Sequence, residues 1–239
     1  MAFTVLASWD FRGADSAATK RVARIGGYTL TEEGTPSWSA DGVDCSGAGG
    51  RRLRLTLPPA LKVSPSWFIA GFRIMNATAP VELTNIVGLR DGASTNLYDA
   101  SMMLVRKPAN TSARVAFSPS GSDTFDVGVT LGVADHICAV RNPGVSPSIG
   151  VRINNDAWDN FALASINILY TATTALMFGT PDSEDVRTRY HWFIMGSGAI
   201  TDAEVQAMYD NPNAYIYSGG GAPTPAPSFG RYCVRGPVR

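Results

Sequence analysis

Apolar and polar residues alternate along many short segments of this 239-residue chain. In segment 52–57 every second residue is leucine, and in segment 149–153 every second residue is isoleucine or valine. Because successive side chains of a strand point to opposite faces, this pattern indicates strands with one buried and one solvated face. We therefore expect a set of core residues on these strands and on the apolar run 67–74. They are Leu53, Leu55, Leu57, Phe68, Phe72, Ile74, Ile149, Val151 and Ile153.

Other short apolar runs, separated by segments rich in glycine and proline, predict further strands. They are expected at 3–11, 27–30, 83–89, 101–106, 113–118, 125–130, 136–141, 162–168, 175–179 and 187–195, with a tight turn at 196–198. No repeat of fixed period is visible in the sequence, which argues against a propeller or a solenoid. Many short strands are most simply buried by packing two antiparallel sheets face to face.

One segment near the C-terminus follows helical rather than strand periodicity. Thr201 and Glu204 have the spacing of a capping box, and Asn211-Pro212 is a stop signal. We predict a short amphipathic helix between these signals. Its apolar face is expected to pack on the sandwich through Val205, Met208 and Tyr209.

The predicted fold class is all-β, a two-sheet antiparallel β-sandwich over residues 1–217 with one short C-terminal helix. Composition changes abruptly at 218–228, where glycine and proline predict an extended linker. Segment 229–239 holds three arginines, two aromatic residues and no acidic residue, which is typical of interface anchors. We therefore expect 218–239 to be a tail that binds neighbouring chains. Its anchor residues would be Phe229, Arg231, Tyr232, Arg235 and Arg239.

Composition and charge argue against several classes of protein. The 20 basic residues balance 20 acidic ones, so no net field favours binding to nucleic acid. No stretch approaches the roughly 20 apolar residues of a membrane span, so we expect no membrane insertion. The segment 1–10 has no basic leader before its apolar run, so we expect synthesis in the cytoplasm.

The three cysteines, Cys45, Cys138 and Cys233, lie in separate regions and have no CxxC or histidine-associated spacing. They therefore predict neither a disulfide framework nor a zinc site. Cys138 lies in an apolar run and is expected in the core, whereas Cys233 lies in the tail and is available to pair with another chain.

Several segments resemble, in order, one family of β-sandwich modules. Asp135-His-Ile-Cys-Ala-Val140 is similar to the family's "W-H-h-v-A-v" strand, and Gly150-Val-Arg-Ile-Asn-Asn155 to its "l-Y-v-N-G" strand and turn. Segment 40–47 resembles its central "G-x-x-F-D-G" turn, with Val43 and Cys45 in place of the usual aromatic residue and glycine. Further matches lie at 9–11, 67–74, 175–179 and the final strand and helix. Together they resemble laminin-G-like modules of the concanavalin A-like lectin superfamily.

This resemblance implies a jelly-roll β-sandwich that binds glycans or proteins, or that forms part of a larger assembly. It also implies that the rim of the sandwich is a possible calcium site, with aspartate carboxylates and backbone carbonyls as ligands. The candidate ligands are the loop pairs Asp41 with Asp44 and Asp156 with Asp159, and a third loop pair of the same kind is Asp182 with Asp185. The alternative is that these aspartates only form turns. We expect no other cofactor.

Three aromatic residues, Trp38, Tyr98 and Trp158, lie in or near expected loops. An exposed aromatic ring at such a place can stack on a sugar ring, which makes these residues candidates for glycan binding. The alternative is that they cap the core of the sandwich.

We expect no catalytic residue. Hydrolytic members of the superfamily carry two glutamates on one strand, separated by an aspartate, as nucleophile and acid. Of the five glutamates here, Glu32 and Glu33 are adjacent and would face opposite ways, and Glu204 is taken up as a helix cap. His136 lies where non-enzymatic relatives often have histidine, which favours a hydrogen-bonded structural role over a general base.

These features favour a non-enzymatic structural or binding component of a bacteriophage virion, such as a capsid decoration, collar or tail-associated protein. Its partners would be other virion proteins or copies of itself, held through the C-terminal tail, and it would reach the virion after synthesis in the host cytoplasm. One alternative is a carbohydrate-binding module that recognises a cell-surface polysaccharide. Another is a degenerate glycan hydrolase or lyase.

Overall fold

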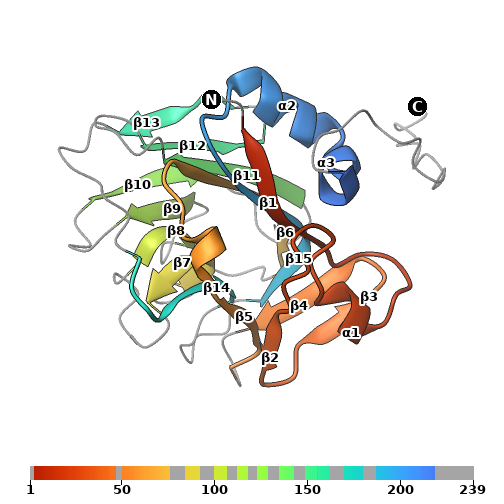
Figure 1. Ribbon diagram of the computed structural model, residues 1–239. Coiled ribbons are helices and arrows are strands. Elements are labelled where there is room, and N and C mark those ends of the chain that lie inside the picture. The colour runs from red at the N-terminus through yellow and green to blue at the C-terminus, as the bar shows by residue number, and fades with distance from the viewer. Residues whose placement is uncertain are drawn as a thin grey trace, which may run out of the picture.

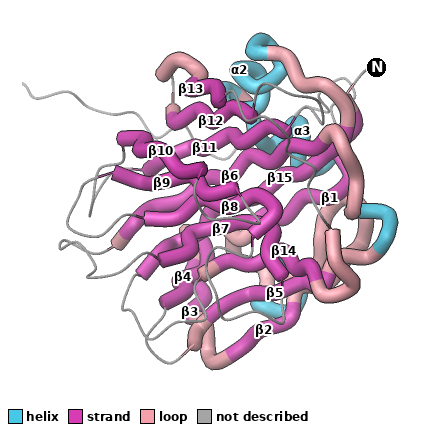
Figure 2. The backbone as a smooth tube through the Cα atoms, turned by 90° about the vertical axis from the view of Figure 1, so that its left-hand side faces the viewer, coloured by secondary structure: helices cyan, strands magenta, loops and turns pink. Residues whose placement is uncertain are grey.

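The computed structural model describes residues 3–46, 50–75, 84–91, 100–106, 112–117, 123–128, 135–142, 149–154, 156–161, 170–179 and 187–218. In this part of the chain two antiparallel sheets pack against each other, which confirms the predicted β-sandwich (Figures 1 and 2). The predicted strand at 162–168 and the tail beyond Ser218 lie outside the described residues.

The first sheet holds eight strands in the described part of the chain. Its path runs through β13 (Asp159–Phe161), β12 (Ile149–Ile153), β11 (Asp135–Asn142), β6 (Ser66–Ile74), β15 (Arg187–Ser197), β4 (Gly42–Ser46) and β3 (Ser37–Ser39). The remaining strand, β1 (Thr4–Asp10), pairs with β15 beyond the end of β4, so β4 and β1 share one edge of β15.

The second sheet faces the first and holds seven strands in the described residues. Its order is β10 (Asp123–Gly128), β9 (Ser112–Phe117), β8 (Ala100–Arg106), β7 (Thr84–Asp91), β14 (Thr174–Phe178), β5 (Arg52–Thr56) and β2 (Thr31–Glu33).

The core between the sheets contains the residues that the alternation predicted. Leu53, Leu57, Phe68, Phe72, Ile74, Val151 and Ile153 are buried there, and Leu55 is half-buried against them. Ile149 lies in β12, but its side chain is outside the described ones. At the centre of the core the ring of Phe178 meets Tyr190 and Phe193 edge to face, a preferred geometry for aromatic pairs. Thus the predicted strand register is confirmed.

Two helices cover part of the outer face of the first sheet (Figure 1). The predicted helix is confirmed as α2 (Asp202–Asp210), with the capping box of Thr201 and Glu204. Buried residues of these helices and of the sheet form an outer apolar cluster, which includes Val205, Met208, Tyr209, Ile216, Trp67, Ile69, Trp192 and Ile194. None of the described helices is long and apolar enough to cross a membrane.

The predicted end of α2 is correct, since the helix ends at Asp210, but the expectation of a single helix was wrong. A further helix, α3 (Pro212–Ser218), begins at Pro212, at the position where proline is tolerated. The helices α1 (Ala17–Lys20) and η1 (Pro59–Leu61) were not predicted.

Two strand predictions also fail. The expected strand at 27–30 is reduced to a single bridge between Val22 and Thr29. The final strand was predicted to end at Met195, before a turn at 196–198, but β15 continues to Ser197, which pairs with Thr4 of β1.

Candidate functional site

The outer face of the first sheet changes character along β15. Arg187, Arg189 and His191 make it polar in the first half of the strand, whereas Trp192 and Ile194 belong to the apolar cluster under the helices. The covered half stabilises the fold by burying apolar area. The polar half is therefore where a binding site on this face would lie.

A β-bulge marks the point where the two halves meet. Tyr190 pairs with Phe72 of β6 and Trp192 pairs with Gly71, so His191 has no paired residue on β6. Bulges of this kind redirect side chains and are common near functional sites. Here the bulge lets both His191 and Trp192 face outward. The indole of Trp192 lies so close over Gly71 that a Cβ there would be 2.5 Å from its Nε1 atom.

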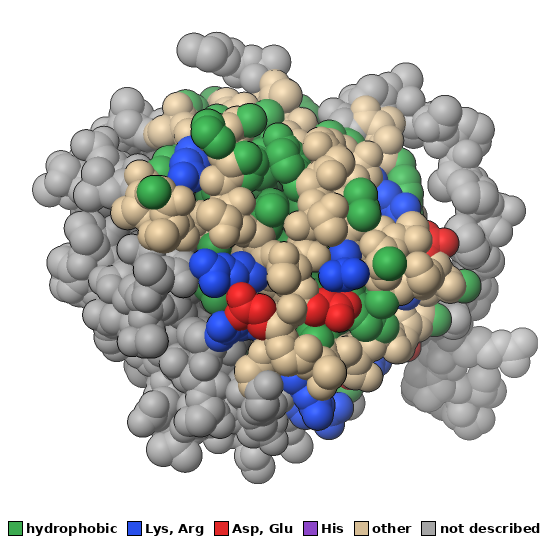
Figure 3. All heavy atoms as spheres, turned by 60° about the horizontal axis from the view of Figure 1, so that its bottom comes forward, with side chains coloured by type: hydrophobic (Ala, Val, Ile, Leu, Met, Phe, Trp, Pro, Cys, Tyr) green, Lys and Arg blue, Asp and Glu red, His purple; other side chains and the backbone are tan. Residues whose placement is uncertain are grey.

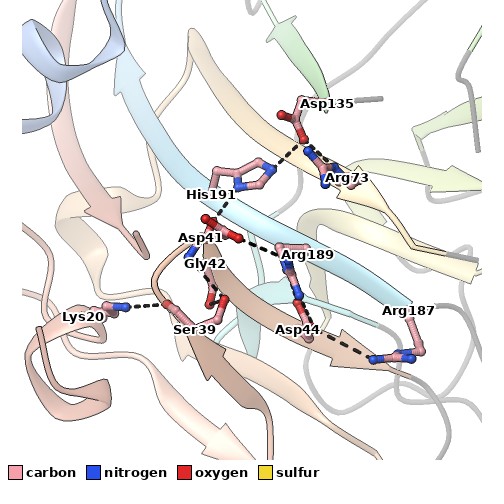
Figure 4. Close-up of polar contacts among 10 residues, drawn as sticks. All are labelled: Lys20, Ser39, Asp41, Gly42, Asp44, Arg73, Asp135, Arg187, Arg189 and His191. Atoms are coloured by element: carbon pink, nitrogen blue, oxygen red, sulfur yellow. Dashed lines mark hydrogen bonds and ion pairs between the residues drawn. The ribbon is translucent and has the colours of Figure 1, made fainter. Parts of the chain in front are cut away.

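His191 connects three segments through its ring nitrogens (Figure 4). Its Nδ1 atom lies 2.6 Å from the backbone carbonyl oxygen of Asp41, and its Nε2 atom lies 3.0 Å from the Oδ1 atom of Asp135. Both partners are hydrogen-bond acceptors, so a ring nitrogen donates to its partner only where it carries a proton. The doubly protonated ring satisfies both contacts, and the neutral ring satisfies one.

Asp135 also accepts a hydrogen bond of 2.7 Å from the Nε atom of Arg73 on β6. Partial burial would by itself raise the pKa of this carboxyl, but the bond from Arg73 and the nearby charges of His191 and Arg73 outweigh burial and lower it. The same hydrogen bond raises the pKa of the Arg73 guanidinium. Asp135 is therefore held as a carboxylate.

Arg189 and Asp44 form a bidentate pair across β15 and β4. The Nε and Nη2 atoms of Arg189 donate to the two carboxylate oxygens of Asp44 at 2.6 and 2.9 Å. Their side chains are only 18% and 11% exposed, so water screens this pair less than an ordinary surface pair. Arg187 lies 3.9 Å from Asp44, and the carboxylate of Asp41 lies 3.7 Å from Arg189.

These side chains form one continuous network across β11, β6, β15 and the β3–β4 hairpin (Figure 4). We call it the polar row, and it consists of Arg73, Asp135, His191, Asp41, Arg189, Asp44 and Arg187. Three arginines balance three aspartates in it. The carboxylates of Asp41 and Asp135 and the guanidinium of Arg187 remain 76%, 55% and 54% exposed, so a ligand can reach them.

The two described aromatic candidates lie apart from the polar row. Trp38 of β3 is half-buried, packs against Phe11, and donates from Nε1 to Glu32 at 2.8 Å. Trp158 is half-buried against the outer apolar cluster, with the guanidinium of Arg141 4.0 Å from its ring centre. Each contributes to packing, and a glycan-binding role for them stays a prediction. Tyr98 and the five anchor residues of the tail lie outside the described residues.

The candidate calcium ligands are placed differently. Asp41 and Asp44 share one hairpin and both face Arg189, whereas Asp156 is exposed after β12. Asp44 lies in β4 and Asp159 begins β13, so the prediction that these two residues lie in loops was wrong; the side chain of Asp159 is outside the described ones, and Asp182 and Asp185 lie outside the described residues. Among the described residues no group of three or more histidine, cysteine or acidic side chains is arranged to hold a metal ion. Calcium binding stays a prediction.

The other described residues that could take part in catalysis, which are glutamates, a histidine and cysteines, lie in structural positions. Glu32 contacts Trp38, Glu33 pairs with Arg52, and Glu204 caps α2. His136 is buried with its Nδ1 atom 3.2 Å from the side-chain amide of Asn154, a structural position. Cys45 and Cys138 are buried free thiols, and burial raises the pKa of each.

A second charged surface lies over β2 and β5, at the lower end of the molecule in Figure 1. Ion pairs there join Glu33 to Arg52 and Arg54, and Glu32 to Arg21. Figure 3, which brings this end forward, shows acidic and basic side chains next to one another among the described residues. This mixture agrees with the balanced charge of the sequence and does not resemble a surface for a polyanion.

Sequence reasoning missed the polar row, although part of the signal was present. Arg187, Arg189 and His191 follow one another at every second position of a predicted strand, which places them on one face. Arg73 and Asp135 could not be added, because their contact depends on the pairing of β6 with β11.

No known protein family matches the chain, and no curated protein does. Solved structures do match its fold. The receptor-binding domain of botulinum neurotoxin mosaic serotype C/D superposes with a TM-score of 0.64 over 87% of this chain and 50% of that chain, at 12% identity. The binding domain of botulinum neurotoxin DC, solved in complex with rat synaptotagmin II, superposes with a TM-score of 0.62 over 86% of this chain and 51% of that chain, at 10% identity.

Trypanosoma rangeli sialidase gives a TM-score of 0.62 over 86% of this chain and 32% of its own, at 10% identity. This chain thus spans about half the length of the neurotoxin domains and about a third of the sialidase. At these identities the likeness concerns the fold, and the chain has a lectin-like β-sandwich fold.

Proposed function

We propose that this chain is a non-enzymatic binding module that recognises a glycan through the polar row on the outer face of its first sheet. The row would bind a neutral, hydroxyl-rich ligand. Carboxylates would accept hydrogen bonds from sugar hydroxyls, and guanidinium groups would donate to sugar oxygens.

The observation that carries this proposal is the fixed, exposed arrangement of the row. Exposed ion pairs contribute about 0–1 kcal/mol each to stability, so the fold itself gains little from the contacts of Asp135 and Asp41, the exposed part of the row. Binding sites, in contrast, need polar groups that are held in place by rigid elements and by their neighbours. Asp135 has this character, because Arg73 and His191 both hold its Oδ1 atom while its carboxylate stays 55% exposed.

The charge balance of the row indicates the class of ligand. With three arginines and three aspartates, the row offers no excess of either sign to attract a polyanion or a polycation. An uncharged ligand with many hydroxyl groups can use donors and acceptors alike. A neutral glycan fits this requirement.

The fold neighbours are compatible with a binding role. Two of them are described as receptor-binding or binding domains, and one of these was solved in complex with rat synaptotagmin II. The sialidase shares the fold over 32% of its own length. Support for a non-enzymatic role comes from the described glutamates, since Glu32, Glu33 and Glu204 each have a structural partner.

At a finer level, we propose that the module belongs to a bacteriophage virion, as a decoration, collar or tail-associated protein. The support is the composition of 218–239, a glycine- and proline-rich linker followed by arginines and aromatic residues that suit contacts with other virion proteins or copies of this chain. Mass spectrometry of purified particles tests this placement. Detection in stoichiometric amounts supports it, and absence from the particles refutes it.

Glycan binding is tested with an array of neutral and acidic oligosaccharides. We expect the unmodified protein to bind a subset of neutral glycans, and Arg73→Met to lose this binding. Arg54→Met is the matched control, because Arg54 also forms an ion pair but on the second sheet. Binding to no glycan, or unchanged binding by Arg73→Met, would overturn the proposal.

A further inference from the structure

We infer that Lys20 is a positioning residue for the polar row: it holds the turn 39–42 of the β3–β4 hairpin, which presents Asp41. This inference deepens the proposed function and rests on it. Lys20 lies at the end of α1 and does not itself reach the row (Figure 4).

Three successive carbonyl oxygens of the turn each accept a hydrogen bond from a different part of the chain. The ammonium of Lys20 donates to Ser39 at 2.7 Å, and the backbone N–H of Gly13 donates to Ala40 at 2.7 Å. The third carbonyl, that of Asp41, faces the Nδ1 atom of His191. A hairpin turn needs no such external bonds to form, so these bonds fix its position relative to α1, to the segment after β1 and to β15.

The turn is also closed internally and pressed against β15. The hydroxyl of Ser39 donates to the carbonyl of Gly42 and accepts from the N–H of Asp41, both at 3.2 Å. Gly42 has a φ of +146°, and a Cβ at this position would lie 2.1 Å from the carbonyl oxygen of Tyr190. Only glycine fits this close approach.

The burial of Lys20 is the unusual feature that needs an explanation. Its side chain is almost fully buried, with 2% of the residue exposed, although lysine is almost never fully buried unless it is paired. Burial lowers its pKa, and the attraction of Asp15 and Asp10 only partly offsets this effect. Its ammonium donates to a main-chain carbonyl, a bond that an apolar residue packed under α1 could not make.

The consequence is an aspartate whose backbone is fixed while its carboxylate stays available. Asp41 is 76% exposed, and its contact with Arg189 is a loose one at 3.7 Å. A group that is held in its bound position before the ligand arrives loses less conformational entropy on binding. Lys20 would thus strengthen ligand binding through the turn.

The test compares Lys20→Met with Lys62→Met by hydrogen exchange and by NMR of the His191 ring. Lys62 is a matched control, because its ammonium also donates at 2.7 Å to a main-chain carbonyl, that of Thr171, away from the row. In Lys20→Met we expect the amides of Gly13 and Asp41 to exchange on the order of tenfold faster, as loss of a charged hydrogen bond implies. The ring nitrogen signals of His191 should shift as well.

Amide hydrogen exchange in the centre of β15 should stay unchanged in Lys20→Met. Lys62→Met should change neither the exchange of the Gly13 and Asp41 amides nor the ring nitrogen signals of His191. If Lys20→Met does not fold, the same measurements are made on Lys20→Gln, whose neutral side chain is one bond shorter than that of lysine and cannot make the charged hydrogen bond to Ser39. Unchanged exchange at Gly13 and Asp41 would overturn the inference, whatever the array shows. A binding measurement completes the test: the neutral oligosaccharide that binds best on the array should bind Lys20→Met roughly tenfold more weakly than the unmodified protein. If no glycan binds the unmodified protein, the proposed function fails, but the hydrogen-exchange result still tests the role of Lys20.

Discussion

Replacing Asp44 by asparagine tests whether the polar row is a fixed network. Asparagine keeps the shape of the side chain but removes its charge and turns one acceptor into a donor that faces the guanidinium of Arg189. The bidentate pair, with bonds of 2.6 and 2.9 Å, would therefore lose one hydrogen bond and its electrostatic attraction.

The expected cost follows from the burial of the pair. Breaking a fully buried ion pair by removing one partner costs about 3–5 kcal/mol, and a hydrogen bond to a charged group contributes about 1.5–3 kcal/mol. The two side chains are 11% and 18% exposed, so some water reaches them. We expect Asp44→Asn to lower the free energy of unfolding by about 2–3 kcal/mol, or the melting temperature by roughly 5–10 °C in a protein of this size.

The assay is urea unfolding of Asp44→Asn beside Asp41→Asn. Asp41 faces the same arginine from the same hairpin, but it is 76% exposed and 3.7 Å away, so its replacement should cost less than about 0.5 kcal/mol. A double-mutant cycle with Arg189→Met should give a coupling energy of at least about 1 kcal/mol for Asp44 and close to zero for Asp41. Equal effects of the two substitutions would refute the reasoning that burial distinguishes them.

Three other substitutions test the fold and the electrostatics. Met208→Asp should lower the free energy of unfolding by a few kcal/mol in urea, because it buries an unpaired charge in the outer apolar cluster; a cost below about 1 kcal/mol would contradict that packing. For Asp135, whose folded pKa is lowered, the stabilising effect is present above its unfolded pKa of about 3.9 and is lost as pH falls through the folded value. The stability difference between the unmodified protein and Asp135→Asn should therefore be present at about pH 5 and shrink below about pH 4, and a difference that does not change between about pH 5 and about pH 2 would contradict the assigned contacts. Gly42→Ala should cost more in thermal unfolding than Gly27→Ala, because both glycines have positive φ but only Gly42 has a backbone oxygen in the way; equal costs would exclude the close approach to Tyr190.

The sandwich was predictable because alternation determines which face of a strand is buried. Leu53, Phe68 and Val151 each occupy the core face that the pattern assigned to them. The helix α2 was predictable for a similar local reason, since Thr201 and Glu204 carry the capping signal within four residues. The further helix α3 was missed because proline was interpreted as a stop, although it is equally suited to begin a helix.

The polar row was less predictable because it depends on strand pairing between distant segments. Alternation places Arg187, Arg189 and His191 on one face, but the bulge after Tyr190, which puts Trp192 on that face as well, has no signal in the local sequence. The contact between Arg73 and Asp135 joins residues 62 positions apart. The burial of Lys20 likewise follows from the packing of α1 against the β3–β4 hairpin, not from the sequence around it.

The central claim is that the polar row binds a glycan, and NMR titration tests it most directly. The titrant is the neutral oligosaccharide that binds best on the array, added to isotopically labelled protein. We predict that the largest chemical-shift changes occur at Asp41, Asp135, Arg189 and His191. Shifts confined to other surfaces, such as the surroundings of Trp158, or the absence of any shift at saturating oligosaccharide, would contradict the claim.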